Sequence, residues 1–225
     1  MASETEKQEY KNSLKATSLF GGVQVYNIII TILKSKVVAL LLGPGGMGIY
    51  GLLTSTTGLI TSATNFGLAT SAVKDIAGAN ASGDMKRVSR TITVFRRWVW
   101  VTGLLGMLVC LGLSSFWSQL TFGNKDYTVA FSVLSLSLLF TQLSSGQIAL
   151  LQGMRKYSFM AKSSVLGSSA GFLLTLPLYY FWGIDAIVLV IVLSSLASLV
   201  LSWYFSRKVQ TEPVRLNWKS EAKRS

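Results

Sequence analysis

The chain has 225 residues, of which 50% are apolar and 13% are charged, whereas soluble proteins carry about 25% charged residues. One cysteine and no histidine exclude a disulfide framework and argue against most metal centres. The net charge of +12 would suggest nucleic acid as the partner of a soluble protein, but in a membrane protein it indicates basic cytoplasmic loops.

Six stretches are long and apolar enough to cross a bilayer as helices, which takes about 20 residues each. They cover residues 18–42, 48–73, 98–117, 128–152, 163–182 and 186–205. Turn-forming residues interrupt the chain within each pair of spans, namely Gly43 to Gly46, Gly123 to Asp126, and Gly183 with Asp185. We therefore predict an all-α, polytopic membrane protein with six transmembrane helices over residues 18–206, an N-terminal segment over 1–17 and a polar tail over 207–225.

Basic residues alternate between the two sides of this arrangement. Eighteen of the 21 lie on the side that holds both termini, Lys125 lies on the other side, and Lys34 and Lys36 fall inside the first span. Cytoplasmic loops concentrate lysine and arginine, so both termini are predicted to be cytoplasmic. The net positive charge is then explained by the basic residues on the cytoplasmic side of the membrane, and no nucleic-acid partner is expected.

One cytoplasmic connection has an amphipathic pattern over residues 84–97. Met85, Val88, Ile92 and Phe95 recur at helical spacing, and Asp84 is placed to cap the helix. One interpretation is a short helix on the inner membrane surface, attracted to anionic membrane lipids. The other is a solvated helix that simply leads into the third span.

Polar residues follow one face of the first span: Gln24, Asn27, Thr31 and Lys34 are spaced by 3, 4 and 3 residues. An amide or ammonium group that faces lipid is unfavourable, by about 2.5–3.5 kcal/mol for lysine. We therefore expect this stripe to line a cavity, whereas Lys36 can extend to the outer interface.

Other spans contribute further candidates for the same translocation cavity, namely Thr54, Thr61 and Asn65 in the second span and Gln142 in the fourth. Serine and glycine residues at similar spacings are more typical of helix packing, and Gly167 with Gly171 forms a GxxxG pair.

Residues for catalysis are lacking, because all nine acids lie outside the predicted spans or at their edges and histidine is absent. We expect no enzymatic activity, no cofactor and no metal. A cationic, hydroxyl-rich cavity would favour an anionic, hydrogen-bonding substrate such as a phosphate-linked sugar.

Two segments resemble the N-terminal half of a known family. They read LLGPGGMGIYGLL at 41–53 and FGLATSAVKDIA at 66–77, and the cytoplasmic helix ends VFRR at 94–97. This pattern resembles Wzx-type O-antigen and polysaccharide flippases, in the multidrug/oligosaccharidyl-lipid/polysaccharide exporter superfamily. The resemblance covers essentially the whole chain.

The resemblance implies a transporter of two six-helix lobes in the bacterial inner membrane, which flips undecaprenyl-diphosphate-linked oligosaccharide. Lys34 falls where related lipid II flippases carry a cavity-facing basic residue, but Ser35 replaces the acid that follows there, which argues against lipid II itself. The expected partners are the lipid-linked oligosaccharide, membrane lipids and a second lobe, either a missing C-terminal half or another copy. A small-solute or drug exporter and a non-transporting scaffold or remnant remain as alternatives.

Overall fold

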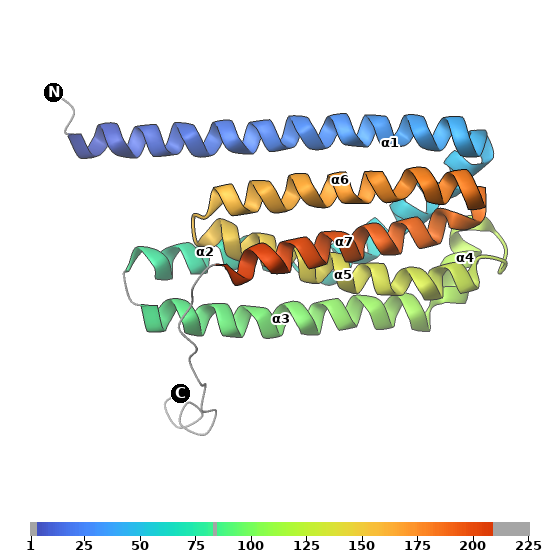
Figure 1. Cartoon of the computed structure of the whole chain (residues 1–225). Coiled ribbons are helices and arrows are strands. Elements are labelled where there is room, and N and C mark those ends of the chain that lie inside the picture. Colours follow the sequence, from blue (N-terminus) through green and yellow to red (C-terminus); the bar gives the residue numbers. More distant parts are fainter. Residues whose placement is uncertain (1–3, 83–84, 209–225) are drawn as a thin grey trace, which may run out of the picture.

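The structure is a computed structural model that describes residues 4–82 and 85–208. Within them every regular element is a helix, which confirms the all-α class, and most helices run along one common direction (Figure 1). The elements are α1 (Glu4–Asn65), α2 (Leu68–Ala81), α3 (Met85–Gly112), α4 (Ser114–Phe122), α5 (Thr128–Gly153), α6 (Tyr157–Trp182), the 3-10 turn η1 (Gly183–Asp185) and α7 (Ala186–Arg207).

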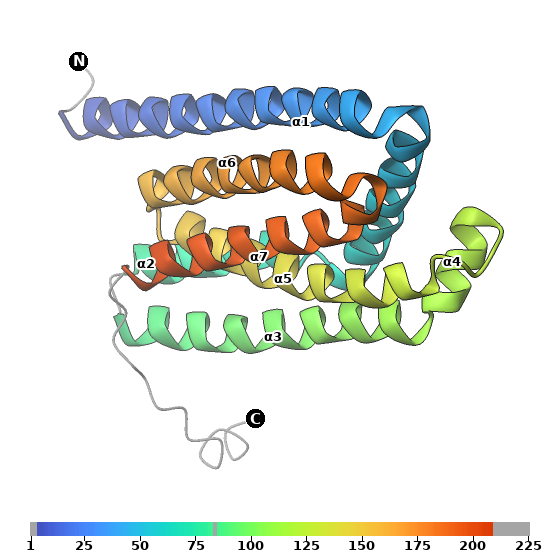
Figure 2. The same cartoon turned by 45° about the vertical axis from the view of Figure 1, so that its right-hand side comes forward.

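Helix α1 is two helical arms joined at Gly43. This residue has φ of 68° and ψ of −173°, a conformation that only glycine adopts readily. The following Pro44 disfavours a helical conformation at Gly43 and then suits the first turn of the next arm. The first arm lies beside α6, and the second turns back toward α2 (Figures 1 and 2).

Four stretches of the described chain are apolar and long enough to cross a membrane: Thr17–Asn65, Lys86–Gly112, Thr128–Gly153 and Tyr157–Arg207. Two of them contain a break, one at Gly43 and the other at η1. Division at these breaks would produce the six predicted spans, and that count stays a prediction.

Helix boundaries match the sequence prediction best in the second half of the chain. Helices α5, α6 and α7 begin or end within a few residues of the predicted spans. The second span differs, because the chain breaks at Phe66 and Gly67, which both have positive φ, and α2 then begins. The third differs too, because α3 ends at Gly112 and α4 covers much of the remainder.

The amphipathic pattern over 84–97 forms the first half of α3 and is not a separate helix on the membrane surface. Val88, Ile92 and Phe95 are buried and pack with Ile76 of α2 and Leu150 of α5. Protein rather than lipid covers the apolar face, so the interpretation of a helix that leads into the third span fits the structure better. Asp84, and with it the expected cap, lies outside the described residues.

Two buried clusters hold the bundle together. The first includes Ile76 and Phe95 and joins α2, α3, α5 and α7. The second includes Leu53, Phe131 and Val190 and joins both arms of α1 to α3, α5, α6 and α7. Burial of each large aliphatic or aromatic side chain contributes about 1.5–3 kcal/mol relative to an aqueous surface, so these clusters fix which helix faces are turned inward.

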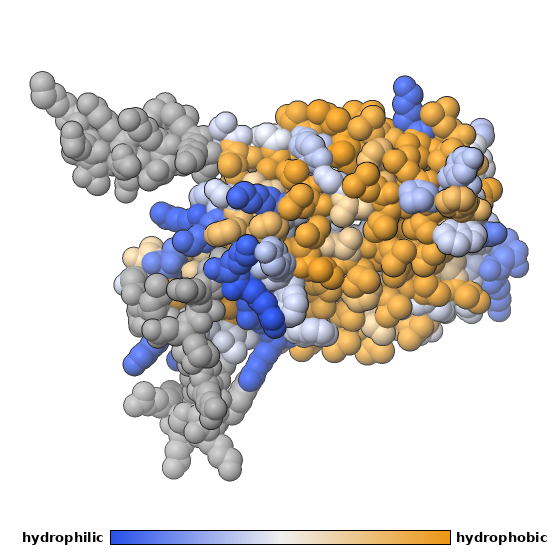
Figure 3. All heavy atoms as spheres, in the orientation of Figure 1, coloured by the Kyte–Doolittle hydropathy of each residue, from blue (hydrophilic) through white to orange (hydrophobic). Residues whose placement is uncertain are grey.

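Hydrophilic groups gather at the ends of the bundle, and an apolar band lies between them (Figure 3). The end of α2, the start of α3, the connection from α5 to α6 and the end of α7 lie together at one end, whereas the loop with Lys125 lies at the other (Figures 1 and 2). The described basic residues are therefore separated in space as the sequence predicts. That the more basic end is cytoplasmic remains a prediction.

Candidate functional site

A pocket of about 380 Å³ lies between the first arm of α1 and helices α5, α6 and α7. Nine of its twelve lining residues are serine or threonine, and the full lining comprises Asn27, Thr141, Ser144, Ser145, Ile148, Ser163, Ser164, Gly167, Ser168, Ser194, Ser195 and Ser198. We call it the serine pocket. None of these lining residues carries a charge, so the pocket suits an uncharged, hydroxyl-rich group.

Asn27 connects the first arm of α1 to α6. Its Nδ2 donates a hydrogen bond to Ser164 Oγ at 3.1 Å, and its Oδ1 accepts one from Ser168 Oγ at 2.9 Å. A second contact between the same two helices joins neighbouring residues, because the Tyr26 and Ser169 hydroxyls are 2.6 Å apart. The α1 amide is thus held by two serines, as expected for a polar group that would otherwise face lipid.

Other hydroxyls of the serine pocket keep hydrogen-bonding capacity. Ser163 Oγ is buried and has no partner among the described atoms. Ser195 donates to the Val192 carbonyl at 2.8 Å, but a hydroxyl oxygen that donates can still accept through its lone pairs. The pocket can therefore both donate hydrogen bonds to a polyhydroxylated ligand and accept them from it.

A second cavity of about 340 Å³ shares Ser145 and Ile148 with the serine pocket. Its remaining lining comes from α2 and from the end of α5, including Thr70 and Gln152. The two cavities are therefore neighbours along α5, and the second is lined mainly by apolar residues such as Val73 and Ala149.

Small residues explain why α6 and α7 approach closely beside the serine pocket. A Cβ atom at Gly167 would lie 3.3 Å from Ser198 Oγ, and one at Gly171 would lie 3.2 Å from Ser194 Cβ. The GxxxG pair therefore packs against serines of α7, which confirms its predicted role in packing.

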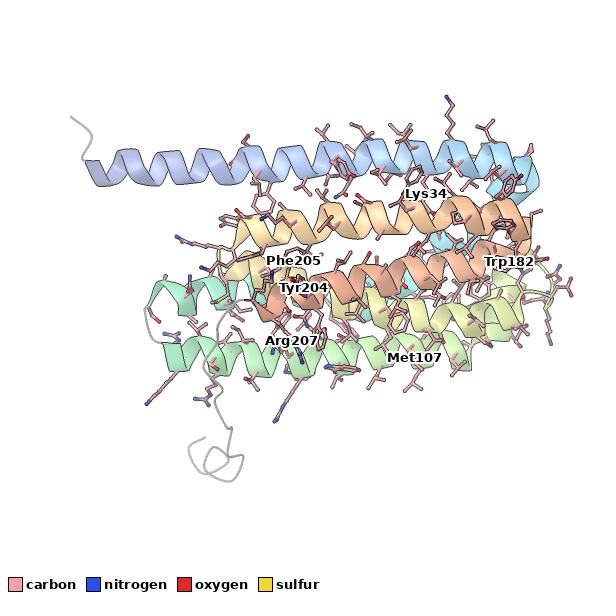
Figure 4. The ribbon with its side chains drawn as sticks, viewed as in Figure 1. Lys34, Met107, Trp182, Tyr204, Phe205 and Arg207 are labelled. Atoms are coloured by element: carbon pink, nitrogen blue, oxygen red, sulfur yellow. The ribbon has the colours of Figure 1, made fainter. Side chains whose placement is uncertain are left out.

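Lys34 lies near the Gly43 break, outside the serine pocket. Its Nζ is 5.7 Å from the centroid of the Tyr50 ring, which belongs to the second arm of α1, and its side chain lies on the side of α1 that faces α6 (Figure 4). Tyr179 of α6 belongs to the core cluster against which Tyr50 packs. It is only 2% exposed, and its hydroxyl has no partner among the described atoms. Lys36, by contrast, is exposed.

Gln142 and Asn65 meet in a different place, where α5 contacts α3 and the second arm of α1. Gln142 is 6% exposed, and its Nε2 donates to Asn65 Oδ1 at 3.1 Å and to Thr102 Oγ1 at 3.0 Å. Thr102 donates in turn to the Trp98 carbonyl at 2.9 Å. We call this closed network the glutamine junction. Its polar groups join helices rather than line the serine pocket.

The remaining predicted cavity residues are on the surface or bonded to their own helix. Gln24 and Thr31 are exposed, and Thr31 donates to the Asn27 carbonyl at 2.8 Å. Thr54 donates to the Tyr50 carbonyl at 2.7 Å, and Thr61 to the Thr57 carbonyl at 2.8 Å. Of the eight predicted residues, Asn27 is the one that lines the serine pocket.

For the serines of this pocket that fall at helical spacing, such as Ser164 and Ser168, the sequence favours packing over cavity lining. The available signal was the repeat of adjacent serine pairs in the interior of three helices: 144 and 145, 163 and 164, and 194 and 195. Adjacent residues in a helix are about 100° apart, so such pairs widen the polar face. Within the described part of the chain, no group of three or more His, Cys, Asp and Glu residues could hold a metal ion.

Comparison with known proteins agrees with this helical, apolar architecture. A family model described as polysaccharide biosynthesis protein matches residues 13–222. Neither a curated protein nor a solved structure matches the chain.

Proposed function

The chain belongs to the polysaccharide biosynthesis protein family, and from this membership, which indicates a polysaccharide-related membrane transporter, we propose that it translocates a lipid-linked oligosaccharide. The serine pocket is the observation that carries the proposal. Neutral sugars present many hydroxyls and no charge, and a lining of serines with Asn27 offers matching donors and acceptors.

The charged part of such a substrate requires a separate group, and we assign that role to Lys34. Lys34 follows Asn27 by seven residues, which places them about 10 Å apart along α1 and within about 20° of the same face. An oligosaccharide in the serine pocket could thus extend its diphosphate toward the ammonium group. The apolar outer band of the bundle suits the polyprenyl chain, which would stay in the bilayer.

The remaining features of the proposal rest on the resemblance of the sequence to Wzx-type flippases. We propose undecaprenyl diphosphate as the carrier, the bacterial inner membrane as the location, and cytoplasmic termini in accord with the distribution of lysine and arginine. The partner is a second six-helix lobe, from the same polypeptide or from another copy. The exposed apolar side chains of Val25, Ile28 and Ile32 offer α1 as a surface for lipid or for that lobe.

Translocation of a fluorescent undecaprenyl-diphosphate oligosaccharide in proteoliposomes tests the proposal. Lys34→Gln should lower the initial rate by about tenfold, as expected for loss of a charge-assisted contact to phosphate of roughly 1.5 kcal/mol. Lys36→Gln removes the same charge from an exposed position two residues away and should leave the rate unchanged.

Other outcomes separate the alternatives. Transport of cationic dyes without transport of the oligosaccharide would favour a drug exporter. A wild-type chain that transports neither, alone or together with a second lobe, would favour a non-transporting scaffold. Equal losses in the two lysine variants would contradict the role of Lys34.

A further inference from the structure

A smaller cavity of about 200 Å³ lies between α3, α5 and α7, away from the serine pocket. Arg96 and Trp100 of α3, Gln147 of α5 and Trp203 of α7 contribute to its lining. It lies near the end of α7, where Arg207 follows Trp203 by one turn (Figure 4). The proposed transport function uses none of these residues.

Two guanidinium groups lie close to this cavity: Arg96 belongs to its lining, and Arg207 lies over the ring of the lining residue Trp203. The Arg207 guanidinium carbon lies 3.6 Å from the centroid of the Trp203 ring, and its charge is close enough to that of Arg96 for the two to repel. Within the described side chains, neither arginine forms an ion pair with a carboxylate. Like charges held together without a counterion mark a site that favours an anion, and guanidinium groups match phosphate oxygens geometrically.

Gln147 adds an unmatched acceptor to the same cavity. Its Oε1 is buried and has no partner among the described atoms. A buried amide oxygen without a donor costs about 1–3 kcal/mol, so a ligand that supplies a hydroxyl would be favoured. Phosphate next to a hydroxyl is the chemistry of a phosphatidylglycerol headgroup.

The surroundings favour a lipid over a soluble phosphate. Trp100 and Trp203 are 52% and 46% exposed, and tryptophan rings favour the headgroup level of a bilayer. The exposed side chains of Leu104 on α3 and Val200 on α7 continue from the tryptophans toward the middle of the bundle. In Figure 3 the hydrophilic groups at the end of α7 border the apolar band directly, as a headgroup above acyl chains would require.

We propose that this cavity binds the phosphate of an anionic phospholipid, with Arg96 and Arg207 on the phosphate, Gln147 on a headgroup hydroxyl, and the acyl chains along α3 and α7. The bound lipid would connect the basic ends of these two helices. It would be a resident lipid rather than the transported substrate.

Native mass spectrometry of the full-length protein in detergent can test the proposal. The protein is mixed with equal amounts of phosphatidylglycerol, phosphatidylethanolamine and phosphatidylcholine that have identical acyl chains. The wild type should retain phosphatidylglycerol preferentially. Arg96→Gln with Arg207→Gln should lower that retention by about fivefold per arginine, about 25-fold together. Gln147→Leu should lower it by about fivefold through loss of one hydrogen bond.

A matched control neutralises two exposed lysines outside the cavity, Lys74 of α2 and Lys162 of α6. Lys74→Gln with Lys162→Gln should change retention by less than about twofold, and equal losses in the two double variants would overturn the proposal. Displacement of the lipid by millimolar glycerol phosphate would also overturn it, because the site would then recognise phosphate without the chains. Equal thermal midpoints must first establish that both double variants are folded, and retention can be measured whether or not the chain transports anything.

Discussion

The serine pocket and the glutamine junction are both polar regions inside an apolar bundle, but they use their hydrogen bonds differently. At the glutamine junction, Gln142 is bonded to Asn65 and Thr102 from two other helices, so the donors are occupied within the protein. In the serine pocket, Ser163 Oγ has no partner among the described atoms and 380 Å³ of space remains. Polar groups within a membrane bundle can therefore either hold helices together or remain available to a ligand.

Gln142→Leu should give the largest loss of stability, because it leaves Asn65 and Thr102 without their partner. We expect the free energy of unfolding to fall by about 2 kcal/mol, measured by denaturant titration in detergent micelles. Gln152→Leu, a half-buried position beside the second cavity, should change it by less than about 0.5 kcal/mol. If the free energy of unfolding falls equally in the two variants, the hydrogen bonds of the glutamine junction do not stabilise the bundle.

Glycine positions provide a second contrast, between the contact of α5 with α3 near the glutamine junction and the contact of α6 with α7 beside the serine pocket. A Cβ atom at Gly146 would lie 2.7 Å from Val99 Cγ1, whereas one at Gly167 would lie 3.3 Å from Ser198 Oγ. Overpacking costs about 1–3 kcal/mol and the helix gains about 1 kcal/mol from alanine. Gly146→Ala should thus destabilise the chain by about 1 kcal/mol and Gly167→Ala by about zero, as shifts in the thermal midpoint will show. The reverse order would indicate that α6 and α7 are the more tightly packed pair.

Removal of three pocket hydroxyls should have the smallest effect, and on transport rather than stability. The variant Ser144→Ala, Ser163→Ala and Ser195→Ala should translocate the oligosaccharide about threefold more slowly, equivalent to about 0.7 kcal/mol. The control replaces Ser135, Ser137 and Ser202, which are buried, bonded to carbonyls of their own helices and outside the pocket. An equally slow control triple would mean that the serine pocket has no special part in transport.

Local sequence pattern predicted the helices of the second half well, because long apolar runs end there at strong breaks such as Gly183 and at the charged pair Arg155 and Lys156. It predicted the end of the second span poorly. Residues 66–77 are apolar enough to continue a helix, but Phe66 and Gly67 adopt positive φ, and packing on α5 then separates α2 from α1.

The candidate site was predicted less completely than the fold. Periodicity correctly placed Asn27 and Lys34 on one side of α1, but periodicity in one helix does not reveal which neighbour uses its hydrogen bonds. Gln142 reads as a cavity residue until Asn65 and Thr102 are found beside it. Likewise, the sequence pattern favours packing for Ser164, and the structure shows that this serine lines a pocket.

The break at Gly43 has a mechanical consequence. Gly43 is the residue at which the described α1 departs from helical geometry, and Asn27 lies 16 residues before it, about 24 Å along the helix. A swing of about 10° at Gly43 would carry Asn27 through about 4 Å, more than the 3.1 Å and 2.9 Å bonds to Ser164 and Ser168 can span. A small torsional change at one glycine would thus break the hydrogen bonds between Asn27 and α6 and move one wall of the serine pocket.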